Sequence, residues 1–257
     1  MRASYTHING LGNDFLVFSG PLRISAQTIA TLCDRATGIG ADGVLVVSPL
    51  SEKRVRMQYW NADGSPAEMC GNGLRCTARY AVANRFVKPG AFHVETPVGP
   101  LEVVCPEEQT APIETQIGRV RCAPAALNLQ NCSWHTATVG NPHAITFVAD
   151  VDAAPVATLG PLIEHDTHFP NKTNVEFAEV VDPARIRLRI WERGVGETKA
   201  CGTGMVAAAV TAAQAKQTQL PVTVCVPGGE AKVWIDPDGY ARLLGPVETT
   251  ASGVTDI

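Results

Sequence analysis

One stretch of the sequence recurs without a gap, and this repeat constrains the fold more than any other feature. Residues 60–73 read WNADGSPAEMCGNG, and residues 191–204 read WERGVGETKACGTG. The register is constant, because Cys70 and Cys201 lie 131 positions apart (201 − 70 = 131), as do the shared tryptophans and flanking glycines. A chain with such a repeat is expected to form two halves of similar structure.

Each copy lies between a strand signal and a helix signal. Apolar residues alternate along 55–59 and along 186–190, which is typical of half-buried strands. The segments 74–83 and 205–213 are rich in residues that favour a helix. The sequence therefore predicts the order strand, glycine-rich loop, cysteine and helix in both halves.

Both cysteines are predicted to lie at helix starts, where backbone N–H groups lack partners and the helix dipole is positive. Such a position binds carboxylates and favours a thiolate, and it can lower a cysteine pKa from about 8.5 to roughly 3.5–7.5. A requirement of folding alone would explain why both copies keep the glycines, but it would not explain why both copies keep a reactive cysteine sulfur at the helix start. We expect four backbone N–H groups to face one anionic ligand, those of Gly71, Asn72, Gly202 and Thr203.

The composition is that of a globular soluble protein. With 257 residues and a hydrophobic fraction of 45%, the chain can bury a core in each half. The formal net charge is −4 and the basic residues are scattered, which argues against nucleic acid as a partner. We expect a cytoplasmic protein with no membrane partner, because no apolar run approaches the roughly 20 residues that cross a bilayer. The eight cysteines show neither a CxxC pair nor a Cys/His zinc spacing, so no metal site is expected.

A second recurring feature is a Gly-Asn turn. Asn13 follows Gly12 in a predicted hairpin, and Asn141 follows Gly140 at an offset of 128 (141 − 13 = 128). Asparagines at turns usually bond their own backbone, but the recurrence makes both of them candidate ligands. A polar stretch before residue 115 marks the expected domain junction, and the C-terminal segment is expected to pair back onto the first half. The expected domains are 1–112 together with 246–257, and 113–245.

Two thiols presented by similar halves suit the inversion of a stereocentre. One thiolate removes a proton from one face of a carbon, while the other thiol delivers a proton to the opposite face. Two helix starts aimed at an adjacent carboxylate would stabilise the carbanion. His143 and Glu192 are titratable and lie near the cysteine units, so they are candidates for setting which sulfur is ionised. Arg193 offers a bidentate clamp for a carboxylate, although all three could also be plain turn or surface residues.

These motifs resemble those of the diaminopimelate epimerases, in the family order. They are GLGNDF at 10–15, TGIGADG at 37–43, NADGS at 61–65, MCGNG at 69–73, GNPH at 140–143, TNVEF at 173–177, ERGVGET at 192–198 and ACGTG at 200–204. The resemblance implies interconversion of LL- and meso-diaminopimelate, in lysine and peptidoglycan precursor synthesis, without cofactor or metal. It also implies an α+β fold of two pseudo-symmetric domains, each a mostly antiparallel curled sheet around a central helix, with the active site in the cleft between them. A homodimer is a further family expectation.

The resemblance also assigns roles to individual residues. The catalytic pair falls on Cys70 and Cys201, and the positions that modulate their pKa fall on His143 and Glu192. The substrate-binding positions fall on Asn13, Asn61, Gly71, Asn72, Asn141, Asn174, Glu192, Arg193, Gly202 and Thr203. One departure is Gly43, where many members carry a glutamine that touches the substrate. That contact is either lost in this chain or supplied from elsewhere.

Two other interpretations stay open on the sequence. A related cofactor-independent racemase would use the same two thiols on another amino acid, although the proline-racemase type usually has histidine where this chain has Asn72. A protein that only binds an amino acid, or a thiol-disulfide protein, would belong to a different class. The lack of CxxC disfavours redox use, and a pure binder would give no solvent hydrogen exchange at the α-carbon of its ligand.

Overall fold

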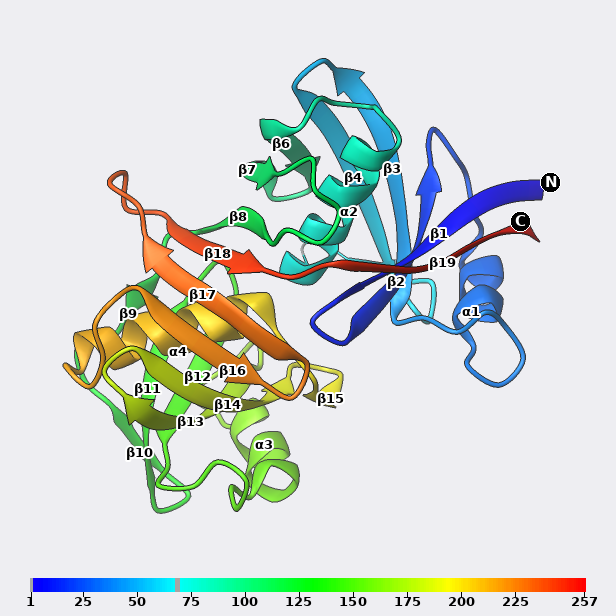
Figure 1. Ribbon diagram of the computed structural model, residues 1–257. Coiled ribbons are helices and arrows are strands. Elements are labelled where there is room, and N and C mark those ends of the chain that lie inside the picture. Colours follow the sequence, from blue (N-terminus) through cyan, green and yellow to red (C-terminus); the bar gives the residue numbers. More distant parts are fainter. Residues whose placement is uncertain (1, 68–69) are drawn as a thin grey trace. The chain divides into compact units, whose positions relative to one another are not determined.

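The computed structural model describes residues 2–67 and 70–257, so Glu68 and Met69 of the first repeat copy lie outside the described residues. The chain divides into two compact units (Figure 1). Unit 1 comprises residues 1–115 and 245–257, and unit 2 comprises residues 116–244. Each unit is a mixed sheet that holds a helix against it, which confirms the predicted α+β class.

The sheet of unit 1 is mostly antiparallel. Its strands are β1 (Arg2–Gly10), β2 (Asn13–Ser19), β3 (Gly43–Ser51), β4 (Arg54–Asn61), β5 (Pro66–Ala67), β6 (Gly90–Thr96), β7 (Gly99–Cys105), β8 (Ile113–Gly118) and β19 (Glu248–Asp256). They pair in the order β19, β1, β2, β3, β4, β6, β7 and β8, and only β2–β3 and β4–β6 are parallel among these pairs. The C-terminal strand β19 therefore lies beside β1, and both ends of the chain belong to unit 1 (Figure 1).

Unit 2 repeats this strand order. Its strands are β9 (Arg121–Cys122), β10 (Leu127–Leu129), β11 (Cys132–Thr138), β12 (Pro142–Phe147), β13 (Asn174–Asp182), β14 (Arg185–Glu192), β15 (Gly196–Thr198), β16 (Val222–Val226), β17 (Gly229–Ile235) and β18 (Ala241–Gly245). The order β11, β12, β13, β14, β16, β17, β18 has parallel pairs at β12–β13 and β14–β16. These are the positions at which unit 1 has its own parallel pairs.

The two units also share their strand register. In unit 1, Val44 pairs with Trp60 across β3 and β4, and in unit 2, Val175 pairs with Trp191 across β13 and β14. Both residues of the second pair lie 131 positions beyond those of the first (175 − 44 = 131; 191 − 60 = 131). The sequence repeat is therefore a structural repeat, and residues at this offset occupy equivalent places.

One helix in each unit follows the repeated cysteine. Helix α2 (Gly71–Ala83) and helix α4 (Gly202–Gln214) both have 13 residues, and nearly every residue of each is buried. They pack against the strands of their own units, so neither needs a polar face. The other helices are α1 (Ala26–Cys33), capped by the Ser25 hydroxyl, and α3 (Val156–Glu164). The repeated helix start is thereby fixed by the core of its unit.

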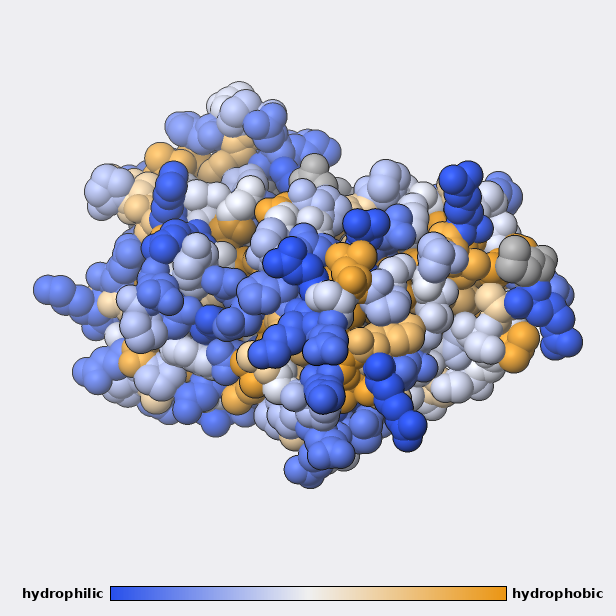
Figure 2. Space-filling model, turned by 90° about the horizontal axis from the view of Figure 1, so that it is seen from above, coloured by the Kyte–Doolittle hydropathy of each residue, from blue (hydrophilic) through white to orange (hydrophobic). Residues whose placement is uncertain are grey.

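The protein surface mixes polar and apolar side chains. Figure 2 shows one face on which hydrophilic residues predominate and apolar residues form small patches. Within the described residues, none of the helices has both the length and the apolar character that a membrane crossing requires.

Candidate active site

Each unit presents its repeated cysteine at the first cap position of a helix. Cys70 precedes α2 and Cys201 precedes α4, and both have an extended backbone with φ of −142° and −128°. The Cys70 sulfur accepts a hydrogen bond from the Gly73 N–H at 3.3 Å. The local prediction is thus confirmed: each sulfur lies where helical N–H groups begin.

In unit 1 the Cys70 thiol lies against the asparagine of the first Gly-Asn turn. Cys70 Sγ is 3.6 Å from Asn13 Oδ1, and it is positioned to donate its proton to that oxygen. The amide of Asn13 is held by Asp42, whose Oδ2 accepts from Asn13 Nδ2 at 2.7 Å and from the Asp14 N–H at 3.0 Å. Arg35 in turn donates to the carboxylates of Asp14 and Asp42. This network fixes which end of the Asn13 amide faces the sulfur.

A buried guanidinium lies against the first turn of α2, which follows Cys70. Arg75 is fully buried and donates to the carbonyl oxygen of Gly71 at 3.3 Å and to Asn72 Oδ1 at 2.7 Å. Burial lowers the Arg75 pKa, while the nearby sulfurs of Cys76 and Cys70 oppose that effect when ionised. Arg75 therefore holds Gly71 and Asn72, two predicted substrate-binding residues, from below.

In unit 2 a chain of hydrogen bonds leads from Cys201 into the core. Cys201 Sγ lies 3.5 Å from Thr203 Oγ1, which accepts a hydrogen bond from Asn141 Nδ2 at 3.2 Å. Asn141 Oδ1 lies 3.0 Å from His143 Nε2, and His143 Nδ1 lies 2.7 Å from Glu176 Oε1. Four residues predicted from the sequence are thus brought together with one that was not, Glu176.

The same chain fixes the protons on His143. Because Asn141 uses its NH₂ group toward Thr203, its oxygen faces His143, so Nε2 must donate. A proton must then lie between His143 Nδ1 and Glu176 Oε1, since two bare acceptors would not approach to 2.7 Å. Both side chains have no exposed surface. The pair is therefore either an imidazolium with a carboxylate or a neutral imidazole with a carboxylic acid.

Carboxylates dominate the electrostatics around Cys201. Burial raises the pKa of Glu192, although hydrogen bonds from Thr198 and from the Cys201 thiol oppose the rise. Burial also raises the Cys201 pKa well above its ordinary value, and the negative charges of Glu192 and Glu176 add to this effect. The tendency of a helix start to favour a thiolate is therefore opposed at Cys201. The local effect of the helix is outweighed by burial and by two carboxylates from neighbouring strands.

The β14–β15 turn holds the remaining charged residue that the sequence suggested. The Arg193 N–H donates to Asn174 Oδ1 at 3.0 Å, and the exposed Arg193 guanidinium donates to the Asn171 carbonyl at 3.2 Å. Asn174 Nδ2 donates to the Pro142 carbonyl, so its amide links this turn to β12. Glu164 accepts from the Trp191 indole at 2.7 Å and from the Gly194 N–H at 2.9 Å, and so ties the turn to α3.

Asn61, a predicted substrate-binding residue, and Gly43, the departure from the family pattern, both lie in unit 1. Asn61 Nδ2 donates to Ser65 Oγ at 3.0 Å within its own turn. Gly43 has no room for a side chain, because a Cβ atom there would lie 2.4 Å from the Trp60 carbonyl oxygen and 2.7 Å from Tyr59 Cε2. The backbone around Gly43 thus excludes a glutamine without a shift of β3 or β4.

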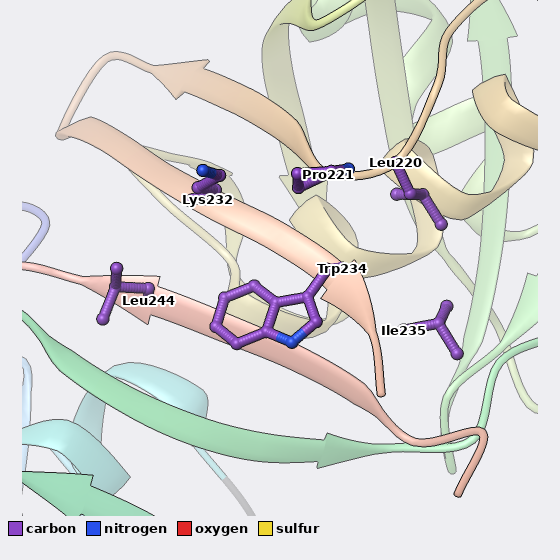
Figure 3. A pocket seen from close by; sticks show the side chains of 6 residues that line it. All are labelled: Leu220, Pro221, Lys232, Trp234, Ile235 and Leu244. Atoms are coloured by element: carbon purple, nitrogen blue, oxygen red, sulfur yellow. The ribbon is translucent and has the colours of Figure 1, made fainter. Parts of the chain in front are cut away.

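The hollows found within single units lie away from both cysteines. One in unit 2, of about 440 Å³, is lined by Leu220, Pro221, Lys232, Trp234, Ile235 and Leu244 (Figure 3). Another, in unit 1, is bordered by Arg79, Tyr80 and residues of β1 and β19. Neither contains any of the residues predicted for the site, so hollow size alone does not identify it.

Comparison with known proteins agrees with the site motifs. The sequence matches the family described as diaminopimelate epimerase over residues 5–123 and 135–250. It is 39% identical to the diaminopimelate epimerase of Azotobacter vinelandii, covering 98% of this chain and 99% of that protein. The corresponding protein of Synechococcus elongatus is 38% identical, covering 100% and 99%. The chain belongs to the diaminopimelate epimerase family.

Solved structures extend the likeness of the fold beyond this family. A PhzF-family phenazine biosynthesis protein from Bacillus anthracis superposes with a TM-score of 0.78 at 14% identity, covering both chains completely. A hydroxyproline epimerase from Agrobacterium vitis gives a TM-score of 0.70 at 11% identity, covering 98% of this chain and 92% of that one. The duplicated fold of the diaminopimelate epimerase family is therefore shared with proteins of much lower sequence similarity.

Glu176, Asp42 and Glu164 are among the residues of this diaminopimelate epimerase family member that the sequence analysis missed. Glu176 lies inside the TNVEF motif, Asp42 inside TGIGADG, and Glu164 at the end of α3. Asp42 orients Asn13, Glu176 pairs with His143, and Glu164 holds the turn of Arg193. For Glu176 a signal existed, since a charged residue in a buried alternating strand requires a partner.

Proposed function

We propose that the protein interconverts LL-2,6-diaminopimelate and meso-2,6-diaminopimelate without a cofactor, by means of Cys70 and Cys201. One cysteine acts as thiolate base and the other as thiol acid, so that the two act on opposite faces of one α-carbon. The observation that carries the proposal is the paired cysteine at an equivalent helix start in each unit of a diaminopimelate epimerase family member. By its place in that family, the enzyme serves lysine and peptidoglycan precursor synthesis.

The remaining residues supply charge stabilisation and orientation. The carbanion formed at the α-carbon delocalises into the adjacent carboxylate, which the N–H groups at the starts of α2 and α4 stabilise. Those groups belong to Gly71, Asn72, Gly202 and Thr203. Glu192 accepts the Cys201 proton when that sulfur serves as base, and it returns the proton when the sulfur serves as acid.

Substrate contacts away from the reacting carbon fall to polar side chains of the two units. Asn13, Asn61, Asn141 and Asn174 supply amide donors and acceptors, and the exposed Arg193 guanidinium supplies a positive charge. A diaminopimelate molecule carries a second amino-carboxylate end, and this set of groups has the complementary chemistry for it. A substrate with one amino-carboxylate end would leave part of the set unused.

The test is proton NMR of the purified protein with meso-diaminopimelate in deuterated water, with and without a chelator. We expect the α-proton signal to disappear and the LL isomer to appear at the same rate in both samples. Loss of the reaction in chelator would contradict cofactor independence. Exchange on another amino acid alone would move the protein to the racemase alternative, and binding without exchange would make it a binding protein.

Each cysteine is tested separately by substitution. Cys70→Ala and Cys201→Ala should each abolish epimerisation, because each face of the carbon needs its own proton carrier. Cys132→Ala serves as the matched control, since Cys132 is a partly buried cysteine of β11 outside the repeat. Normal turnover by either active-site variant would rule out the two-cysteine mechanism.

Assembly and location complete the proposal. We infer a homodimer in the cytoplasm, with a small amino acid as the ligand and neither nucleic acid nor membrane as a partner. The basis is family membership together with the scattered basic residues of the sequence. Light scattering coupled to gel filtration should give twice the mass of the chain, and a monomer that retains full activity would overturn the dimer.

A further inference from the structure

The carboxylate of Glu164 lies at a helix end that does not favour a negative charge. Glu164 is the last residue of α3, where backbone carbonyls lack helical partners and the helix dipole is negative. The residue is only 3% exposed, so the carboxylate also loses most of its hydration. A carboxylate in this place costs free energy unless other groups bind it. The groups that bind Glu164 therefore indicate what it does.

Two N–H donors bind the two oxygens of Glu164 separately. The Trp191 indole donates to Oε2 at 2.7 Å, and the Gly194 N–H donates to Oε1 at 2.9 Å. Lys172 Nζ lies 3.7 Å from the same Oε1. Only a carboxylate of this length can accept at both ends, because the amide of a glutamine has one acceptor end and one donor end. The carboxylate thus joins the end of α3 to β14 and to the turn that follows β14.

The Trp191 ring is also held by packing. Helix α3 lies beside β14 and β15 (Figure 1). A Cβ atom on Gly160 of α3 would lie 2.7 Å from Trp191 Cγ, so the indole packs directly against the helix backbone. Packing therefore fixes the indole even without Glu164. What the carboxylate adds is the hydrogen bond to the Gly194 N–H in the turn.

Gly194 adjoins Arg193, whose exposed guanidinium is the positive charge of the proposed substrate site. A Cβ atom on Gly194 would meet no atom of the described residues within 4 Å, so this part of the turn is not fixed by packing. Hydrogen bonds hold it: the Arg193 N–H donates to Asn174 Oδ1 at 3.0 Å, and the Gly194 N–H donates to Glu164. The bond to Glu164 has a charged acceptor and is the stronger kind.

The internal repeat places this carboxylate and the guanidinium in the same unit. Helices α1 and α3 end 131 positions apart, so Glu164 corresponds to Cys33 (164 − 33 = 131). Arg193 corresponds to Ala62 (193 − 62 = 131). In unit 1, Trp60 packs against the apolar cluster that contains Cys33. Of the two equivalent helix ends, only the one joined to a turn with a guanidinium has a carboxylate.

We propose that Glu164 is a positioning residue, which fixes the β14–β15 turn through Gly194 and thereby presents the Arg193 guanidinium to the second amino-carboxylate end of diaminopimelate. The proposal rests on the function proposed above and adds a determinant of substrate affinity. The carboxylate of Glu192, the last residue of β14, is held separately by the Thr198 hydroxyl at 2.5 Å. Loss of Glu164 should therefore weaken substrate binding more than proton transfer.

The first test follows the turn itself, without substrate. Amide hydrogen exchange of residues 192–198 is measured by mass spectrometry in the wild type and in Glu164→Gln. We expect exchange in this segment to be about tenfold faster in the variant, because glutamine cannot accept both hydrogen bonds. The equivalent segment of unit 1, residues 61–67, should keep its wild-type rate. Equal rates for residues 192–198 would overturn the proposal.

The second test is steady-state epimerisation of meso-diaminopimelate. Glu164→Gln should raise KM about tenfold, as loss of one hydrogen bond to a charged group allows, and should change kcat less. Glu179→Gln is the matched control, because Glu179 is another carboxylate of unit 2 that accepts from a backbone N–H, that of Val151, and from a side chain, that of Arg187. This control should leave KM unchanged. An unchanged KM in folded Glu164→Gln would also overturn the proposal.

A double variant separates positioning of Arg193 from a general loss of structure. Arg193→Ala should itself raise KM, and adding Glu164→Gln should raise it no further, because the group that Glu164 positions is gone. Effects that multiply would show that Glu164 acts by another route and would refute its role. If Glu164→Gln does not fold, Glu164→Asp serves instead, because it keeps the charge but is too short to reach both donors.

The two tests fail independently of each other. If diaminopimelate is not epimerised but exchange of residues 192–198 is faster in Glu164→Gln, the proposed function fails and the hold of Glu164 on the turn stands. If epimerisation occurs but its KM does not respond to Glu164→Gln, the function stands and the role of Glu164 in substrate affinity fails.

Discussion

A single methyl group at Gly204 is a direct test of the buried carboxylate in unit 2. In Gly204→Ala the new Cβ atom would lie 2.7 Å from Glu176 Oε1, which is closer than non-bonded contact permits. Glu176 is fully buried, and its Oε1 is held at 2.7 Å by His143 Nδ1, so the carboxylate cannot move without losing that bond. Overpacking of this kind costs about 1–3 kcal/mol.

The repeat supplies a matched control at Gly73, the third residue of α2 as Gly204 is of α4. A Cβ atom on Gly73 would meet its nearest neighbours, Cys70 Cβ and Leu45 Cδ2, at 3.4 Å, an ordinary contact. Both substitutions replace glycine by alanine in a helix, which favours the helix by up to about 1 kcal/mol in each case. This gain cancels in the comparison, so the difference between the two variants reports the strain of about 1–3 kcal/mol.

The assay is thermal unfolding of both variants and the wild type at neutral pH. We expect Gly73→Ala to unfold at or above the wild-type Tm, and Gly204→Ala to unfold below it. A strain of about 2 kcal/mol corresponds to a difference of roughly 4–8 °C between the variants for a domain of this size. Equal Tm values for the two variants would refute the placement of Glu176 against α4.

Two further predictions concern residues that the sequence analysis left open. Gly43→Gln should lower Tm and should not create a substrate contact, because its Cβ atom would lie 2.4 Å from the Trp60 carbonyl oxygen. An unchanged Tm together with a lower KM for meso-diaminopimelate would contradict this prediction. Burial alone would raise the Glu164 pKa, but hydrogen bonds from Trp191 and Gly194 hold it below its ordinary value. The Glu164 carboxylate therefore adds stability above its unfolded pKa of about 4.3, and this is lost as the pH falls through its folded pKa. The Tm of Glu164→Gln should accordingly lie below that of wild type at pH 7 and approach it near pH 3, and a difference that is constant with pH would argue against the effect.

Local sequence signals predicted the scaffold because each acts within a few residues. Alternation placed β4 and β14, and the Cys-Gly-x-Gly pattern placed both cysteines at helix starts. The same signals could not predict the environment of Cys201. His143 and Glu176 are 33 positions apart and meet only because β12 and β13 pair in parallel. Which sulfur is ionised stayed open on the sequence for this reason: a helix start is a local feature, whereas burial and nearby carboxylates, which raise the Cys201 pKa, are set by tertiary structure.

Equivalent positions of the two repeat copies hold the same residue in some places and different residues in others, and the two kinds of position have different consequences for Cys70 and Cys201. Features kept in both copies, such as the cap cysteine and the third-position glycine, are what any two such units need in order to hold a sulfur at a helix start. A difference in electrostatic environment between the two sulfurs, by contrast, cannot come from features that both copies share. That asymmetry must come from positions where the copies diverge, and Leu45 against Glu176 and Arg75 against Val206 are such positions on one shared backbone. Positions that the two copies share thus identify the candidate reacting atoms, and positions that differ set the electrostatic environment of each.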